Sequence, residues 1–219
     1  RSVNIGLVNE LKIAADKMGV DIWEVIEAAS TKPFGFKAFY PGPGLGGHCI
    51  PIDPFYLTWK AKEYGVHTRF IELAGEINES MPKYVVQNTS KALNTRKKSI
   101  NGSSVLLMGL AYKENVDDMR ESPTFHIMDQ LKQLGAEVSY FDPHIPVITS
   151  TREHSDWTGL GSVKWDETSI SQFDCVIICT DHQCFNYQQL VDWADVVLDT
   201  RNALSKAGVT PKENQRFQS

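Results

Sequence analysis

The chain has 219 residues, 42% of them hydrophobic and 22% charged, which is enough to bury one large core or two smaller ones. Its net charge of −5 argues against a general nucleic-acid or membrane-surface binder, although a local basic pocket for a phosphate-bearing ligand remains compatible with it. No apolar run reaches the length of a bilayer span, and no signal peptide is evident.

The first residues carry a helical pattern. Apolar side chains recur at steps of three and four, namely Val3, Leu7, Leu11 and Ala14. This spacing predicts an amphipathic helix that ends near Gly19. The chain starts with Arg1 rather than Met, and no capping residue precedes the helix, so we expect the sequence to be part of a longer chain.

A second short helix and a long loop follow. Asp21 and Glu24 are spaced as a capping box, which predicts a helix to about Ala29. Residues 30–52 are rich in glycine, proline and aromatic residues. A loop of this length within a compact domain is usually functional or disordered, and its aromatic residues argue against disorder.

Two more helices are predicted before a basic linker. Asp53 and Pro54 are expected to be the N-cap and first residue of a helix that ends near Gly65. A further apolar face covers residues 70–93, and Pro82 is expected to break or restart that helix.

The polar stretch NTRKKSING, at residues 94–102, is predicted to be a domain boundary. Residues 1–98 are then a helical domain and residues 99–219 an α/β domain. Apolar segments predict strands at residues 104–110, 136–143, 174–180 and 195–200, and a capped helix at residues 122–134. Apolar strands that alternate with helices favour a parallel sheet with right-handed crossovers.

Ligands of such sheets bind at the carboxyl ends of the strands. The residues at those ends are 110–113, 142–143, 181–182 and 201–202. Only Gly109 follows the first strand, so the second domain has a nucleotide-binding layout without the GxGxxG fingerprint.

The stretch PGPGLGGHCIPIDPF, at residues 41–55, carries the candidate chemistry. Cys49 lies just before the predicted helix, whose positive N-terminal end favours a thiolate. Asp53 is near enough in sequence to take or hold a proton, and His48 is an alternative acceptor for the same thiol. A small buried cysteine, an ordinary helix cap and turn-forming glycines are the competing interpretation.

The amino-acid sequence of this stretch, together with the later segments GLAYKENVDDMRESP and DCVIICTDH, resembles the UDP-glucose/GDP-mannose dehydrogenase family. The resemblance extends over nearly the whole chain. The resemblance implies a central dimerisation domain followed by a Rossmann-like nucleotide-sugar-binding domain. Family members are NAD-dependent and oxidise the C6 alcohol of a nucleotide sugar to a carboxylate. Cys49 would be the nucleophile, passing through a thiohemiacetal and a thioester, and Asp53 would assist proton transfer and water attack.

The resemblance also implies ligand contacts. Substrate-binding residues would be Phe39, Tyr40, Gly42, Leu45, Gly46, Tyr112, Lys113 and Arg201. Arg120 would reach toward the cofactor. Alternatives remain open at three of them: loop packing for Phe39, a solvated side chain for Lys113, and an ion pair with Asp117, Asp118 or Glu121 for Arg120.

The sequence departs from the family pattern in two respects. Pro33 stands where UDP-glucose dehydrogenases carry an arginine, so the branch of the family that acts on UDP-N-acetylhexosamines is favoured. Sequence similarity alone favours GlcNAc over ManNAc as the sugar. The family's N-terminal NAD-binding domain is not found in these residues, so we expect the chain alone to be inactive. A non-catalytic dimerisation and UDP-sugar-binding module, and a UDP-glucose 6-dehydrogenase, are the alternatives.

The sequence also carries expectations about metal binding, the redox compartment and the partners of the protein. The four cysteines, Cys49, Cys175, Cys179 and Cys184, show no zinc spacing and predict no metal site. Disulfides among the last three would need an oxidising compartment, so a reduced, cytoplasmic protein is expected. Because the opening helix resembles that of the family's central domain, the resemblance implies a homodimer through this domain. Neither nucleic acid nor membrane is expected as a partner.

Overall fold

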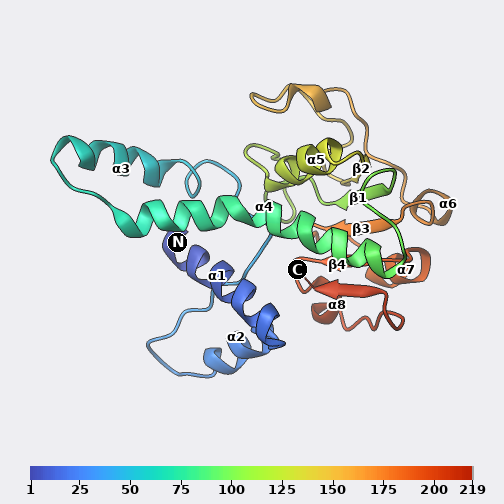
Figure 1. The fold of residues 1–219 in the computed structure, drawn as a ribbon, viewed down its shortest axis with the longest axis horizontal. Helices are drawn as coiled ribbons and strands as arrows, with labels where there is room; N and C mark the ends of the chain where they lie inside the picture. The colour runs from blue at the N-terminus through green and yellow to red at the C-terminus, as the bar shows by residue number, and fades with distance from the viewer. Residues whose placement is uncertain (219) are drawn as a thin grey trace.

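The computed structural model describes residues 1–218 and contains a helical part followed by a sheet with helices on both faces (Figure 1). The helical part consists of α1 (Ser2–Met18), α2 (Ile22–Ser30), α3 (Asp53–Glu63) and α4 (Arg69–Thr95). The sheet part consists of β1 (Ser104–Met108), α5 (Pro123–Gln133), β2 (Glu137–Phe141), the 3-10 helix η1 (Ser155–Trp157), α6 (Glu167–Ile170), β3 (Cys175–Ile178), α7 (Tyr187–Trp193), β4 (Val197–Asp199), α8 (Ala203–Lys206) and β5 (Arg216–Gln218). The predicted α/β class is confirmed.

The sheet is parallel throughout, with the strand order β2-β1-β3-β4-β5. Leu107 in β1 lies opposite Tyr140 in β2 and Ile177 in β3, which gives the register of these three neighbouring strands. β1 is shorter than predicted because Gly109 adopts a φ of +93°, which turns the chain out of the strand. The edge strand β5 was not predicted from the sequence.

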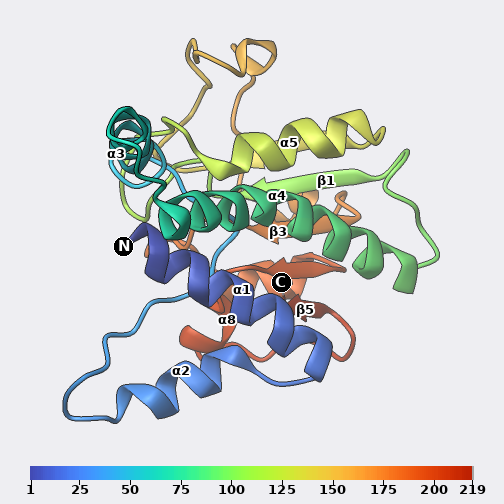
Figure 2. The same cartoon turned by 60° about the vertical axis from the view of Figure 1, so that its left-hand side comes forward.

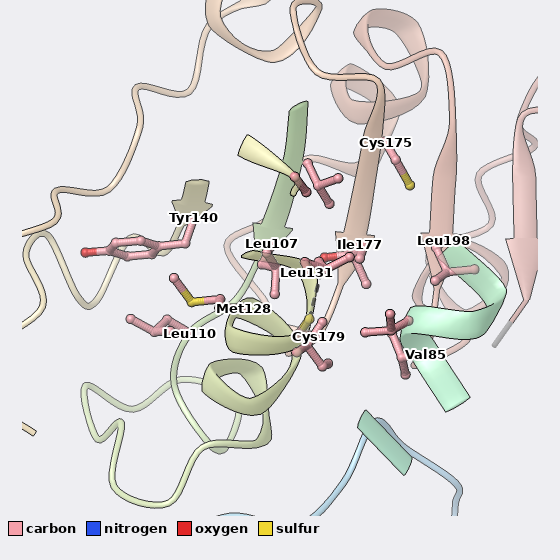
Figure 3. Packing of buried hydrophobic residues seen from close by; sticks show 14 of the residues in the cluster. Val85, Leu107, Leu110, Met128, Leu131, Tyr140, Cys175, Ile177, Cys179 and Leu198 are labelled. Carbon is pink, nitrogen blue, oxygen red and sulfur yellow. Dashed lines mark hydrogen bonds between the residues drawn. The ribbon is translucent and has the colours of Figure 1, made fainter. Parts of the chain in front are cut away.

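Alternate residues of the strands build two cores. Leu107, Ile177 and Leu198 face α4 and α5, where Met128, Leu131 and Val85 pack on them (Figure 3). The intervening residues, among them Leu106, Val176 and Val197, pack on α7 and α8 from the opposite face. Both faces of the sheet are therefore covered, as its almost uninterrupted apolar strands require.

Helix α4 joins the two parts of the chain (Figure 2). Its residues from Ala74 to Tyr84 contact α1, and its last residues pack on α5 and the sheet. The prediction that Pro82 breaks or restarts this helix is wrong, because α4 runs through it without interruption. A proline inside a helix costs about 3 kcal/mol, and burial of the Pro82 ring and packing along both halves of α4 offset that cost. The division at residues 98 and 99 stays a prediction.

Within residues 1–218 no helix combines the length and apolarity that a bilayer crossing requires.

Candidate functional site

Residues 41–52, here called the Cys loop, connect the residues after α2 to the start of α3 and lie against the ends of β1 and β4. The loop has no regular secondary structure, as its glycines and prolines predict. Its first anchor is Asn9 on α1, whose side-chain oxygen accepts from the N–H of Gly42 at 3.0 Å. The Asn9 amide donates to Asn78 on α4 at 2.9 Å, so a fully buried asparagine ties two helices to the loop.

Gly42 also faces Arg201, which follows β4. A Cβ at position 42 would lie 2.5 Å from a terminal nitrogen of Arg201, so only glycine allows this approach. The Nε atom of Arg201 donates to the carbonyl of Cys179 at 2.7 Å. Among the described residues, its terminal nitrogens make no hydrogen bond, and burial lowers the pKa of the guanidinium. An anion beside the guanidinium would offset part of the free-energy cost of burying its charge.

Gly46 and Gly47 dock on Tyr112, which follows β1. A Cβ at position 46 would lie 2.5 Å from the Cβ of Tyr112 and 2.7 Å from the carbonyl oxygen of Glu121. Gly47 has a φ of +77°, and its N–H donates to the carbonyl of Arg120 at 3.0 Å. These contacts bring the Cys loop and the segment after β1 together.

Cys49 is exposed at the turn that precedes α3, and its neighbour His48 is paired with Asp53. The His48 Nδ1 atom lies 3.0 Å from Oδ1 of Asp53, and both side chains are about half exposed. The prediction that Asp53 caps α3 is wrong. Ile52 occupies the cap position and Asp53 is the first helical residue, because the preceding turn is already helical and directs the Asp53 carboxylate to His48.

The remaining predicted substrate residues lie in three different places. Phe39 is half-buried against the cluster formed by α1 and α2, and Tyr40 stacks on Trp23 at 5.7 Å. Leu45 lines a pocket of about 410 Å³ between the Cys loop, α4 and α5. Lys113 is exposed in the segment after β1. The structure thus pairs Gly42 with Arg201 and Gly46 with Tyr112, and it places Phe39 and Tyr40 beside α1 and α2.

Arg120 forms an ion pair with Asp118, which is the alternative interpretation given above for this residue. Its Nε atom donates to both carboxylate oxygens of Asp118 at 3.0 Å, and one terminal nitrogen donates at 2.6 Å. The hydrogen bonds from Arg120 lower the pKa of Asp118. A second pocket, of about 350 Å³, is lined by Arg120 together with His48 and Gly47. Arg120 therefore borders the space beside the Cys loop while paired with a carboxylate.

Three buried polar residues that support the site were not assigned a role from the sequence: Asn9, Asp142 and His182. Asp142 accepts from the N–H groups of Leu110 and Ala111 at 2.7 and 2.9 Å, and His182 lies within 3.1 Å of it. The available signal was positional, because Asp142 lies at the end of the strand predicted at residues 136–143 and His182 two residues after the strand predicted at residues 174–180. Asn9 lies off the apolar stripe of Val3, Leu7 and Leu11, which is exposed, so no pattern in the sequence indicated that this asparagine is buried.

The other cysteines take no part in this arrangement. All four cysteines are free, and burial raises the pKa of Cys175 and of Cys179 to about 12. These two thiols are therefore inert core side chains.

Comparison with known proteins agrees with the resemblance. Residues 1–80 match the central domain of the UDP-glucose/GDP-mannose dehydrogenase family, and residues 106–206 match its UDP binding domain. The UDP-N-acetyl-D-glucosamine 6-dehydrogenase of Pseudomonas aeruginosa is 37% identical over 185 residues, which cover 84% of this chain and 42% of that protein. The UDP-N-acetyl-D-mannosamine dehydrogenase of Methanococcus maripaludis is 34% identical over 212 residues, covering 93% and 45% respectively.

Solved structures give the same result. A UDP-D-ManNAc dehydrogenase from Pyrococcus horikoshii superposes with a TM-score of 0.83 and 30% identity, covering 100% of this chain and 48% of that one. The chain spans about half the length of the curated relatives it matches. The fold and both matched domains make this chain a member of the UDP-glucose/GDP-mannose dehydrogenase family.

Proposed function

We propose that this chain is the central and C-terminal part of an NAD-dependent UDP-N-acetylhexosamine 6-dehydrogenase. The observation that carries the proposal is the docking of the Cys loop, with Cys49 exposed, on the ends of β1 and β4. Relatives named for UDP-N-acetylglucosamine and for UDP-N-acetylmannosamine both support an amino-sugar substrate. We prefer the GlcNAc epimer, and substrate competition decides between the two.

Oxidation of an alcohol to an acid removes two hydrides, and NAD supplies the acceptor for each when it is bound. We propose that the Cys49 sulfur adds to the aldehyde carbon formed first, giving a thiohemiacetal. Loss of the second hydride leaves a thioester on Cys49. Water then adds to that carbon, the carbon–sulfur bond breaks, and the carboxylate leaves with the thiol restored.

The proton transfers are assigned to the pair of His48 and Asp53. With its Nδ1 proton directed at Asp53, the His48 ring presents a lone pair on Nε2. Among the described residues Nε2 has no partner, so it can take the thiol proton and later activate water. The Asp53 carboxylate orients the ring and stabilises its protonated form, the role that a third group plays in activated nucleophile systems.

Binding of the nucleotide is assigned to the strand ends. The two free terminal nitrogens of Arg201 suit a diphosphate, because a guanidinium presents donors in a fixed fork. Lys113, exposed in the segment after β1, adds a second positive charge. We propose that Tyr112, Gly42, Leu45 and Gly46 form the wall against which the sugar lies.

Arg120 is the residue of this chain that borders the proposed cofactor space. Asp118 occupies its Nε atom and one terminal nitrogen, so the other terminal nitrogen is left for a phosphate or ribose oxygen. This geometry suits a secondary contact between Arg120 and the cofactor. The main NAD site is proposed to lie in a domain outside these residues, so the chain alone is expected not to oxidise the sugar.

We also propose an oligomeric state and a cellular compartment for the whole protein. Val3, Leu7 and Leu11 expose an apolar stripe on α1, which suits a homodimer through the helical part. The free thiols suit a reducing compartment, and we propose that the enzyme works in the cytoplasm.

Calorimetric titration of the chain with UDP, UDP-glucose, UDP-GlcNAc and UDP-ManNAc tests the binding role. We expect the two amino sugars to bind more tightly than UDP-glucose, and Arg201→Ala to weaken all four ligands. In the intact protein Cys49→Ser should abolish acid formation. Normal activity of that variant, or turnover of a UDP-sugar by the isolated chain with NAD, would refute the corresponding part of the proposal.

A further inference from the structure

Asp142 and His182 form a buried pair beneath the segment after β1. Asp142 is 1% exposed and His182 is fully buried. The Nε2 atom of His182 lies 3.1 Å from Oδ2 of Asp142, and its Nδ1 atom accepts from the N–H of Asn115 at 2.8 Å. Because Nδ1 accepts, Nε2 carries the proton, so the ring is neutral and in a single tautomer.

Both members of the pair hold the backbone of residues 110–115. Asp142 accepts from the N–H groups of Leu110 and Ala111, at the start of the segment. His182 accepts from Asn115 at its end. Tyr112 and Lys113 lie between these two attachment points. The pair therefore fixes both ends of the short arch that carries two proposed ligand-binding side chains.

This arch is the surface on which the Cys loop docks. The Cβ and ring of Tyr112 fill the space that side chains at Gly46 and Gly47 would need. The Tyr112 N–H donates to the Asp118 carbonyl at 3.0 Å, and the Arg120 carbonyl accepts from Gly47, so the two segments are joined by backbone as well. A displaced arch would therefore displace residues 46–49.

We propose that His182 is a positioning residue for the nucleotide-sugar site, acting through the N–H of Asn115. The proposal rests on the proposed UDP-sugar function for its binding consequence, and on geometry alone for its effect on the arch. His182 reaches neither the sugar nor Cys49. It keeps residues 110–115 in the conformation that presents Tyr112 and Lys113 and supports the Cys loop.

Three substitutions separate this role from general stabilisation. His182→Asn places an amide oxygen near the Nδ1 position and can still accept from Asn115. His182→Gln places an amide nitrogen near Nε2 and can still donate to Asp142. His182→Phe retains an aromatic ring and loses both bonds. All three lower the melting temperature, since each removes at least one buried hydrogen bond.

The test combines hydrogen exchange with UDP titration on the 219-residue chain. For His182→Phe and His182→Gln we expect exchange at residues 110–118 and 44–49 to accelerate about tenfold, the effect of one lost buried hydrogen bond, and UDP to bind about tenfold more weakly. His182→Asn should stay within about threefold of the unmodified chain in both measurements.

The proposal is overturned if the Asn and Gln substitutions behave alike, or if exchange at residues 44–49 does not change. If His182→Phe does not fold, the comparison of Asn with Gln still decides. If the unmodified chain fails to bind UDP, the proposed function fails, while the exchange measurements still decide the positioning role.

Discussion

Substitution of Gly46 by alanine tests whether the Cys loop is held on the segment after β1. A Cβ at this position would lie 2.5 Å from the Cβ of Tyr112, 2.7 Å from the Glu121 carbonyl oxygen and 3.2 Å from the Pro123 ring. Separations under 3 Å between such atoms are strongly repulsive. None of the three atoms is the end of a flexible side chain, so the backbone itself must move.

Overpacking of this kind costs about 1–3 kcal/mol. We expect the upper half of that range, because two of the contacts are below 3 Å and involve a carbonyl and a Cβ. For a chain of this size about 1 kcal/mol shifts the melting temperature by about 2–4 °C, which predicts a fall of roughly 4–12 °C for Gly46→Ala. If the Cys loop detaches instead, the free energy of unfolding falls only by the amount that docking of the loop contributes, and Cys49 becomes more accessible.

Two measurements cover both outcomes: the melting temperature, and the rate of Cys49 alkylation in a Cys184→Ser background. Gly161→Ala is the matched control, since a Cβ there meets no atom closer than 3.8 Å. The control should be neutral or slightly stabilising, because alanine reduces the entropy of the unfolded chain. If Gly46→Ala matches Gly161→Ala in both measurements, the docked geometry is wrong.

Two further predictions concern the buried polar residues. Asn9→Ala should lower the free energy of unfolding by about 2–4 kcal/mol, because it leaves the side-chain oxygen of Asn78 and the N–H of Gly42 without their partner. Asn4→Ala on the exposed face of the same helix should change the free energy of unfolding by less than about 0.5 kcal/mol, and equal effects of the two substitutions in urea unfolding would contradict this. For Asp142, burial alone would raise the pKa of the carboxyl, but hydrogen bonds from His182 and backbone N–H groups leave it below 3.8. The ionised carboxylate therefore stabilises the fold above about pH 4, and this contribution is lost as the pH falls through the folded pKa. The stability difference between the unmodified chain and Asp142→Asn should be constant from about pH 5 to 7 and shrink below about pH 4; a difference independent of pH would contradict the depressed pKa.

Local pattern was sufficient for the elements whose signals lie within a few residues. Helix α1 was predicted from its apolar spacing, and α5 from Ser122, which accepts from Thr124 as a cap should. The four predicted strands were found in place, each a few residues shorter. Buried parallel strands are almost continuously apolar, so their ends are set by hydrogen bonding and by residues such as Gly109, and periodicity does not reveal them.

The errors occurred where distant residues decide the outcome. Pro82 should end a helix by local rules, but packing along α4 keeps it helical. Asp53 before a proline is a good cap by composition, yet His48 competes for its carboxylate. Strand β5 has only three residues and is stabilised by pairing with β4, so nothing in its own sequence is strong enough to predict it.

The Cys loop shows the same dependence on distant residues, and with consequences for function. Its irregular backbone offers few hydrogen bonds of its own, so its conformation must be imposed by partners elsewhere in the chain. Those partners are Asn9 on α1 for its beginning, Arg201 after β4 for Gly42, and Tyr112 after β1 for Gly46. One partner belongs to the helical part and two to the sheet part, so the position of Cys49 depends on both. A binding or reactivity assay on either part by itself would therefore examine a loop without its support, and the chain should be tested whole.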